Sequence, residues 1–183
     1  MNKALVIIDV QNDYFPGGRK ELKDSLEALE NIQKVIKNCR EKGCKIIFIK
    51  HIAIKPTATF FINGTSGVEI HKGIEPEEND EIIIKNYPNS FRETDLKEVL
   101  NRNQITDLVF TGMMTHMCVD TTVRAAFDLG YSSILISDCC ATLDLTYENE
   151  MIKAKEVQNV FLAALNGTFC KIMITDDFIE QKK

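Results

Sequence analysis

Six short apolar runs recur along the chain and are separated by longer segments of mixed character. Apolar residues are nearly continuous within each run rather than alternating, which is typical of strands buried on both faces of a parallel sheet. The runs are ALVIID, KIIFIK, EIIIK, LVFTG, SILIS and KIMIT, at 4–9, 45–50, 81–85, 108–112, 133–137 and 171–175. They predict the strands of one mostly parallel sheet.

Four segments between these runs have the three- and four-residue apolar spacing of amphipathic helices. They lie at about 23–42, 93–102, from Met117 or Cys118 to just before Gly130, and 149–165. Strands that alternate with such helices form successive βαβ units. We therefore predict an α/β fold, a three-layer α/β/α Rossmann-like domain with about six strands that covers residues 1–183 as a single unit.

The connection at 51–80 breaks this alternation. Its sequence, HIAIKPTATFFINGTSGVEIHKGIEPEEND, contains several glycines and prolines and shows no long helical period. Connections of this length without regular structure commonly serve as lids or binding loops. We expect residues 51–80 to be a lid or an active-site loop.

Composition narrows the class of partner. The chain is 44% hydrophobic and 27% charged with a net charge of -5, so it has no general attraction for nucleic acid or anionic membrane. It shows neither a secretory signal nor an apolar run near the roughly 20 residues that span a bilayer. The six cysteines are irregularly spaced, which favours reduced thiols in the cytoplasm and no structural zinc. A small-molecule substrate is the expected partner.

Three chemically complementary residues follow predicted strands. In an open parallel sheet, ligands bind beyond the carboxyl ends of the strands, so those ends are the places to inspect. Asp9 ends the first run, Lys85 ends the third, and Cys118 follows the fourth in the stretch TGMMTHMC. The topology brings a carboxylate, an ammonium and a thiol to one edge of the sheet.

Each of these residues alone has an ordinary explanation: turn chemistry for Asp9, a solvated strand end for Lys85 and core packing for Cys118. Together they suit a nucleophilic reaction. Lys85 and the start of the third helix would favour the Cys118 thiolate, and Asp9 would accept a proton and return it to a leaving group. Backbone N–H groups at the same helix start would bind an oxyanion.

The three histidines are weaker candidates for catalysis. His116 lies two residues before Cys118, and side chains at that spacing tend not to face one another. His51 and His71 lack the spacing of a metal site, so we predict neither a metal nor a cofactor and assign both to structure or the lid. The candidate substrate-binding residues are Tyr14, Tyr87, Phe91, His116 and Met117.

Three blocks resemble, in order, the signatures of the isochorismatase-like cysteine hydrolase superfamily, which includes nicotinamidases and N-carbamoylsarcosine amidase. The blocks are ALVIIDVQNDYF, EIIIKNYPNSFRETDL and LVFTGMMTHMCVDTTVRAAFDLGY, and the resemblance covers nearly the whole chain. It implies a catalytic triad of Asp9, Lys85 and Cys118. It also implies a cis Met113-Met114 peptide, an oxyanion hole made by the backbone N–H groups of Met114 and Cys118, and a homo-oligomer.

The leading expectation is hydrolysis of an amide, ureide or carbamoyl C–N bond through a Cys118 thioester. Nicotinamidases carry a metal-binding Asp and histidines after the second strand, where this chain reads IKHIAIKPT. Some isochorismatases lack the cysteine and cleave a vinyl ether, so the retained Cys118 favours covalent chemistry. A vinyl-ether hydrolase, a nicotinamidase and a non-catalytic binding protein of the same fold are the alternatives.

Overall fold

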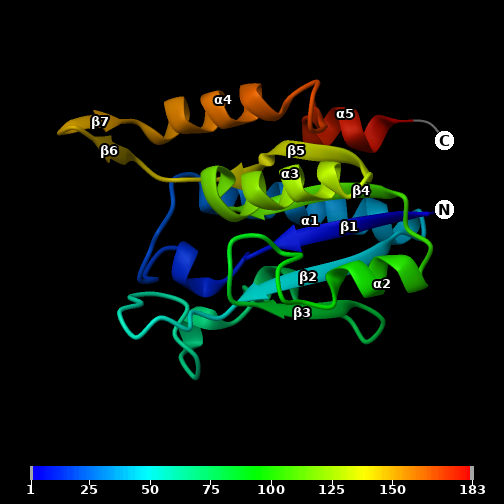
Figure 1. The fold of residues 1–183 in the computed structure, drawn as a ribbon, viewed down its shortest axis with the longest axis horizontal. Coiled ribbons are helices and arrows are strands. Elements are labelled where there is room, and N and C mark those ends of the chain that lie inside the picture. The colour runs from blue at the N-terminus through cyan, green and yellow to red at the C-terminus, as the bar shows by residue number, and fades with distance from the viewer. Residues whose placement is uncertain (1, 182–183) are drawn as a thin grey trace.

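One six-stranded sheet runs through the computed structural model, which describes residues 2–181 (Figure 1). The strands are β1 (Lys3–Ile8), β2 (Lys45–His51), β3 (Glu81–Lys85), β4 (Asp107–Met113), β5 (Ser132–Ala141) and β8 (Lys171–Met173). Their order is β3-β2-β1-β4-β5-β8, and every neighbouring pair is parallel. The predicted α/β fold is confirmed. Residues 1 and 182–183, at the ends of the predicted domain, lie outside the described residues.

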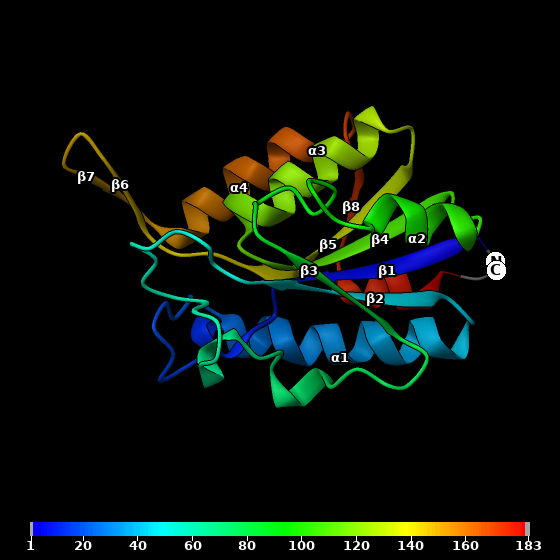
Figure 2. The same cartoon turned by 60° about the horizontal axis from the view of Figure 1, so that its bottom comes forward.

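Helices cover both faces of this sheet (Figure 2). One face carries α1 (Ser25–Glu41) and α5 (Thr175–Glu180), and the other carries α2 (Leu96–Arg102), α3 (Asp120–Asp128) and α4 (Ala154–Leu165). Alternate residues of β1 enter the two cores, Leu5 and Ile7 on the α1 side and Val6 and Ile8 on the other. Because both faces are buried, the strand is continuously apolar. No helix within residues 2–181 is long and apolar enough to cross a membrane.

Two elements differ from the sequence prediction. The helix expected from 149 begins at Ala154, because β6 (Leu145–Tyr147) and β7 (Glu150–Ile152) form an antiparallel hairpin that projects from the body (Figure 1). Its two turn residues have φ angles of 47° and 66°, the left-handed conformation of tight hairpin turns. The last predicted strand is also shorter than expected, because α5 begins at Thr175.

Short helical turns complete the connections. Three 3-10 turns span Asn12–Tyr14, Ser66–Val68 and Lys72–Ile74, and a π-helical turn, Thr115–Val119, leads directly into α3. The first of these turns follows β1, and the second and third lie within the long connection after β2.

Buried polar residues after β1 hold the long connection in place. The side chain of Gln11 accepts from the N–H of His51 at 2.7 Å and donates to its carbonyl at 2.9 Å, and it also donates to the carbonyl of Val68 at 2.7 Å. The carboxylate of Asp13 accepts from the N–H of Phe61 at 2.6 Å. These contacts fix the segment from His51 to Val68 against the carboxyl ends of the strands.

Candidate active site

Four neighbouring strands each bring one reactive side chain to the same edge of the sheet. Along the strand order, Lys85 ends β3, His51 ends β2, Asp9 follows β1, and Cys118 lies on the π-helical turn after β4. The order of the strands reverses between β1 and β4, which is where open α/β sheets bind ligands. Asp9 and Cys118 therefore flank the expected binding crevice.

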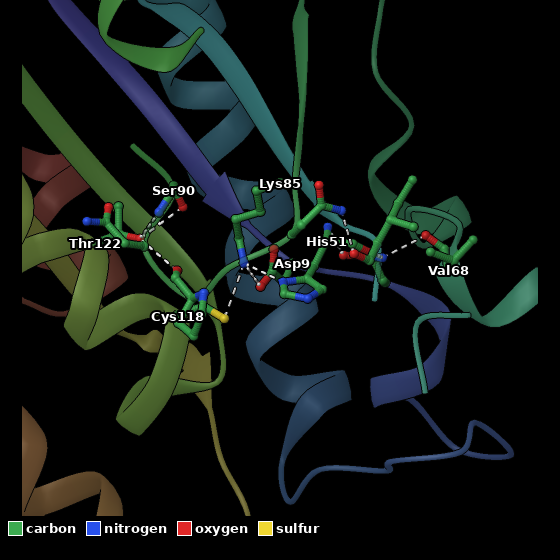
Figure 3. Close-up of polar contacts among 12 residues, drawn as sticks. Asp9, His51, Val68, Lys85, Ser90, Cys118 and Thr122 are labelled. Atoms are coloured by element: carbon green, nitrogen blue, oxygen red, sulfur yellow. Dashed lines mark hydrogen bonds and ion pairs between the residues drawn. The ribbon is translucent and has the colours of Figure 1, made fainter. Parts of the chain in front are cut away.

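The ammonium of Lys85 lies at the centre of this group (Figure 3). Its Nζ atom is 2.8 Å from Oδ2 of Asp9, 2.8 Å from Nδ1 of His51 and 3.3 Å from Sγ of Cys118. An ammonium has three protons to donate and no lone pair, so each proton has one acceptor here. Nδ1 of His51 must accept, and the proton of its neutral ring therefore lies on Nε2.

Burial and charge set the protonation of this group. Burial acts to lower the pKa of Lys85, but the neighbouring Asp9 and Cys118 outweigh it, and the pKa lies above its usual value. Burial and the charge of Lys85 lower the pKa of His51 to about 4. At neutral pH Lys85 is charged and His51 is neutral.

The thiol of Cys118 is protonated in the resting protein. Burial, and after it the negative charge of Asp9, raises the pKa of Cys118, while Lys85 acts in the opposite direction and only partly offsets this. Lys85 does favour the thiolate, as expected, but burial of Cys118 and the negative charge of Asp9 outweigh its effect on the pKa. Attack by sulfur therefore requires a base that removes the proton as the reaction proceeds.

Asp9 has the free lone pairs that such a base needs. One carboxylate oxygen, Oδ2, binds Lys85, whereas Oδ1 is buried and has no hydrogen-bond partner among residues 2–181. The reactive atoms of Asp9, His51 and Cys118 all lie within 4.8 Å of one another. Asp9 itself has a φ of 51°, a backbone conformation that is uncommon outside glycine. A buried carboxylate with an unused oxygen beside a thiol is suited to proton transfer.

The turn that carries Cys118 also offers backbone donors. The Met113-Met114 peptide is cis, as the resemblance implied, and Met114 directly precedes the turn. The first N–H groups of a helix lack intrahelical acceptors, which leaves amides at this position free to bind an oxyanion. Gly112 permits this geometry, because a Cβ atom there would collide with the backbone of Ile8.

A cavity of about 580 Å³ opens beside Cys118. Three of the five predicted substrate-binding residues, Tyr14, Tyr87 and Met117, line it. Cys118 lines the cavity together with Met114, the predicted oxyanion donor, and with residues of the predicted active-site loop, and the sequence did not single out Asn86 and Pro88. The lining residues of that loop are His51, Ala53, Ile54, Lys55, Thr57, Ala58, Thr59, Phe60 and Phe61. Most of them belong to the segment after β2, so that segment forms one wall of the cavity.

The other two predicted substrate-binding residues lie outside this wall. Phe91 stacks on Tyr131 with ring centroids 6.1 Å apart. Nδ1 of His116 is 2.6 Å from Oγ1 of Thr142, and its ring packs edge-to-face with Phe161. Both predictions are corrected, because each side chain has a packing partner away from the cavity.

Two further polar contacts have structural roles. Nδ1 of His71 accepts from the N–H of Gly73 at 3.1 Å. The hydroxyl groups of Ser90 and Thr122 are 2.9 Å apart and join the segment after β3 to α3 (Figure 3).

Asp9, His51 and Cys118 have the types and spacing of metal ligands. The ammonium of Lys85 contacts all three, however, and takes the position that a cation would need. The arrangement therefore does not fit a metal ion while Lys85 is charged.

Comparisons with known proteins agree with this geometry. A family model described as the isochorismatase domain matches residues 3–165. The isochorismatase family protein YddQ of Bacillus subtilis is 40% identical over 180 residues, which cover 98% of this chain and 100% of that protein. Nicotinamidase 3 of Arabidopsis thaliana is 29% identical over 153 residues, covering 77% of this chain and 74% of that protein.

The fold is shared as well. A crystal structure described as an isochorismatase hydrolase, from Oleispira antarctica, has a TM-score of 0.95 at 37% identity and covers 98% of this chain and 97% of its own. Because the family model and these relatives align along most of its length, the chain belongs to the isochorismatase family of hydrolases.

Proposed function

We propose that this protein is a cysteine hydrolase that cleaves the C–N bond of a small amide, ureide or carbamoyl compound. The observation that carries the proposal is the buried contact of Lys85 with both Asp9 and Cys118, together with the unpartnered Oδ1 of Asp9. A relative named as a nicotinamidase supports an amide bond as the target. Asp9, Lys85 and Cys118 are the proposed catalytic residues.

The first half of the reaction forms a thioester. Asp9 removes the proton of the Cys118 thiol as sulfur attacks the substrate carbonyl carbon. The resulting oxyanion is bound by the N–H groups of Met114 and Cys118. Asp9 then returns the proton to the departing nitrogen, the C–N bond breaks, and the acyl group remains on sulfur. Lys85 stays charged throughout and offsets the negative charge that moves between Asp9 and Cys118.

The second half releases the acid. Asp9 takes a proton from water as the water oxygen attacks the thioester carbonyl, and the same backbone donors bind the second oxyanion. The C–S bond breaks, Cys118 recovers its proton from Asp9, and the carboxylic acid leaves.

The cavity indicates the character of the rest of the substrate. Tyr14 packs on Phe61 with ring centroids 4.6 Å apart, and Phe60 packs on Phe61 at 4.9 Å. Among residues 2–181, Lys55 is the one Lys, Arg, Asp or Glu side chain that lines the wall, and it is exposed. Burying an unpaired charge against such a surface is costly, so an uncharged and largely apolar substrate is favoured.

The test is an ammonia-release screen over amides, ureides and carbamoyl compounds. We expect turnover by the wild-type protein, trapping of an acyl adduct on Cys118 by mass spectrometry, and loss of both in Cys118→Ser. Cys44→Ser, which makes the same change at a free cysteine outside the cavity wall, is the matched control and should behave as wild type. Activity that survives Cys118→Ser but not Asp9→Asn would instead indicate an acid-catalysed hydrolase such as the vinyl-ether type.

A further inference from the structure

His51 occupies a position that the chemistry described so far does not use. Strand β2 lies between β1 and β3, and His51 pairs in register with Lys85. Its backbone is held on both sides by the fully buried side chain of Gln11, which accepts from its N–H and donates to its carbonyl. The position of the imidazole is therefore set by the sheet and by a dedicated glutamine.

The two ring nitrogens of His51 have different surroundings. Nδ1 accepts a proton of Lys85 at 2.8 Å, which places the ring proton on Nε2. The ring also forms part of the cavity wall, and no hydrogen bond from Nε2 occurs among residues 2–181. Its neighbour on the wall is the apolar ring of Phe61, with centroids 5.8 Å apart. Nε2–H is thus a polar donor in an apolar cavity, without a protein acceptor.

This arrangement excludes two other roles for His51. It cannot remove the proton of Cys118, because its basic lone pair on Nδ1 is already bound to Lys85 and its other nitrogen carries a proton. It cannot bind a metal ion through Nδ1 while the ammonium of Lys85 is present. What remains is a neutral ring that accepts on one side and donates on the other.

We propose that His51 orients the substrate by donating its Nε2–H to a second acceptor of the substrate, while its Nδ1 holds Lys85 toward Cys118. The inference rests on the proposed hydrolase function. The scissile carbonyl oxygen is assigned to the backbone donors of Met114 and Cys118, so the partner of Nε2–H is a different oxygen or nitrogen. The substrate class is accordingly an uncharged amide that carries an additional hydrogen-bond acceptor beside the bond that is cleaved.

Two substitutions separate the two halves of this role. In His51→Asn the amide oxygen can replace Nδ1 as the acceptor for Lys85, whereas the amide nitrogen takes the place of Cδ2, so no donor lies at the position of Nε2–H. In His51→Phe both functions are lost, while the ring that packs on Phe61 is kept. His71→Asn is the matched control, because it makes the same change at a histidine outside the cavity.

The first measurement compares two substrates that differ only in the second acceptor. For the substrate that has it, His51→Asn should raise KM about five- to tenfold, the usual value of one uncharged hydrogen bond, and should leave kcat within about twofold. For the substrate that lacks it, KM should not change. An equal effect of His51→Asn on both substrates, or an effect as large in His71→Asn, would overturn the donor role.

The second measurement needs no substrate. The rate at which iodoacetamide alkylates Cys118 is followed as a function of pH by peptide mass after proteolysis, which separates Cys118 from the other free cysteines. We expect the profile of His51→Asn to match wild type and that of His51→Phe to shift, because Lys85 has then lost one acceptor. An unchanged profile in His51→Phe would overturn the Nδ1 role.

The two measurements also separate this inference from the proposed function. If the wild-type protein hydrolyses none of the amides, ureides and carbamoyl compounds, the proposed function and the donor role fail together. In that case the pH profile of Cys118 alkylation would still test whether Nδ1 of His51 accepts from Lys85. If hydrolysis depends on Cys118 but not on His51, the function stands and the inference fails.

Discussion

Asp9 and Asp13 are two buried carboxylates in the same loop after β1, and their surroundings differ in one respect. Both oxygens of Asp13 accept from backbone amides, Oδ1 from Arg19 at 3.2 Å and Oδ2 from Phe61 at 2.6 Å. Asp9 has one oxygen on Lys85 and one with no partner among residues 2–181. A buried carboxylate whose oxygens are all engaged holds structure, whereas one with a spare oxygen is available for proton transfer.

The largest expected effect comes from Asp9→Asn. Asparagine keeps the size of the side chain and an acceptor for Lys85, but it cannot carry a proton to or from Cys118. We expect kcat to fall by about 10²- to 10⁴-fold, the usual contribution of a general acid-base group. Steady-state ammonia release measures the loss, and far-UV circular dichroism checks that the fold is kept. If Asp13→Asn reduced kcat more than Asp9→Asn does, the assignment of proton transfer to Asp9 and of a structural role to Asp13 would be wrong.

Asp13→Asn should act mainly on stability. Replacing one carboxylate oxygen by an amide nitrogen leaves the N–H of Arg19 or Phe61 facing another donor. We expect the free energy of unfolding to fall by about 1–3 kcal/mol, the cost of one unsatisfied buried group. Urea unfolding measures this value. Because Phe61 is a wall residue, KM should rise as well, and a variant as stable as wild type would contradict the structural role.

Lowering the pH should reduce the free energy of unfolding, because protonation of His51 is less favourable in the folded protein than in the unfolded chain. The pKa of His51 is about 4 in the folded protein and about 6.5 in an unfolded chain, so the unfolded chain binds the proton first as pH falls. Its contribution to stability is complete above pH 6.5 and is lost as pH falls toward 4. Urea unfolding at several pH values should show a smaller loss over this interval in His51→Asn. Parallel pH curves for the two proteins would refute this linkage.

Asn12 lies between the two carboxylates and gives the smallest expected effect. Its side chain donates to the carbonyl of Ser66 at 2.8 Å in an exposed position. Water can replace such a contact, so Asn12→Ala should lower the free energy of unfolding by about 0.5–1 kcal/mol and leave kcat unchanged. A loss of stability as large as that of Asp13→Asn would show that burial does not explain the difference between Asn12 and Asp13.

Much of the framework could be predicted from the pattern of apolar residues. Each buried strand is marked by a continuous apolar run, and the carboxyl ends of parallel strands share one edge, so Asp9, Lys85 and Cys118 could be placed together. The same rule identifies His51, which is the last residue of β2, once that strand is extended by one residue beyond the predicted 45–50. His51 was assigned to structure or the lid because it lacks the spacing of a metal ligand, although its place at the end of β2 puts it beside Lys85.

Other features depend on contacts that no local pattern shows. The bonds from Gln11 and Asp13 reach partners 40 and 48 residues away, in a segment without regular structure. The orientation of His116 depends on Thr142 and Phe161, which belong to other elements. The resting protonation of Cys118 follows from burial among these elements, and burial of a single thiol cannot be read from its neighbours in sequence.

The hairpin of β6 and β7 remains without a packing partner among residues 2–181. It exposes large apolar side chains, with Tyr147 68% exposed and Met151 60% exposed. The expected homo-oligomer stays a prediction, and sedimentation of the full chain would measure it directly.

The ion pair of Lys85 and Asp9 joins one positive and one negative charge, and their neighbours His51 and Cys118 are neutral at rest. The reactive group as a whole is therefore electroneutral and casts little field into solvent. An uncharged substrate carries no net charge for the field of the protein to act on, so its capture rate should be insensitive to ionic strength. Encounter then depends on diffusion and on the apolar wall, and selection among metabolites takes place after contact rather than at a distance.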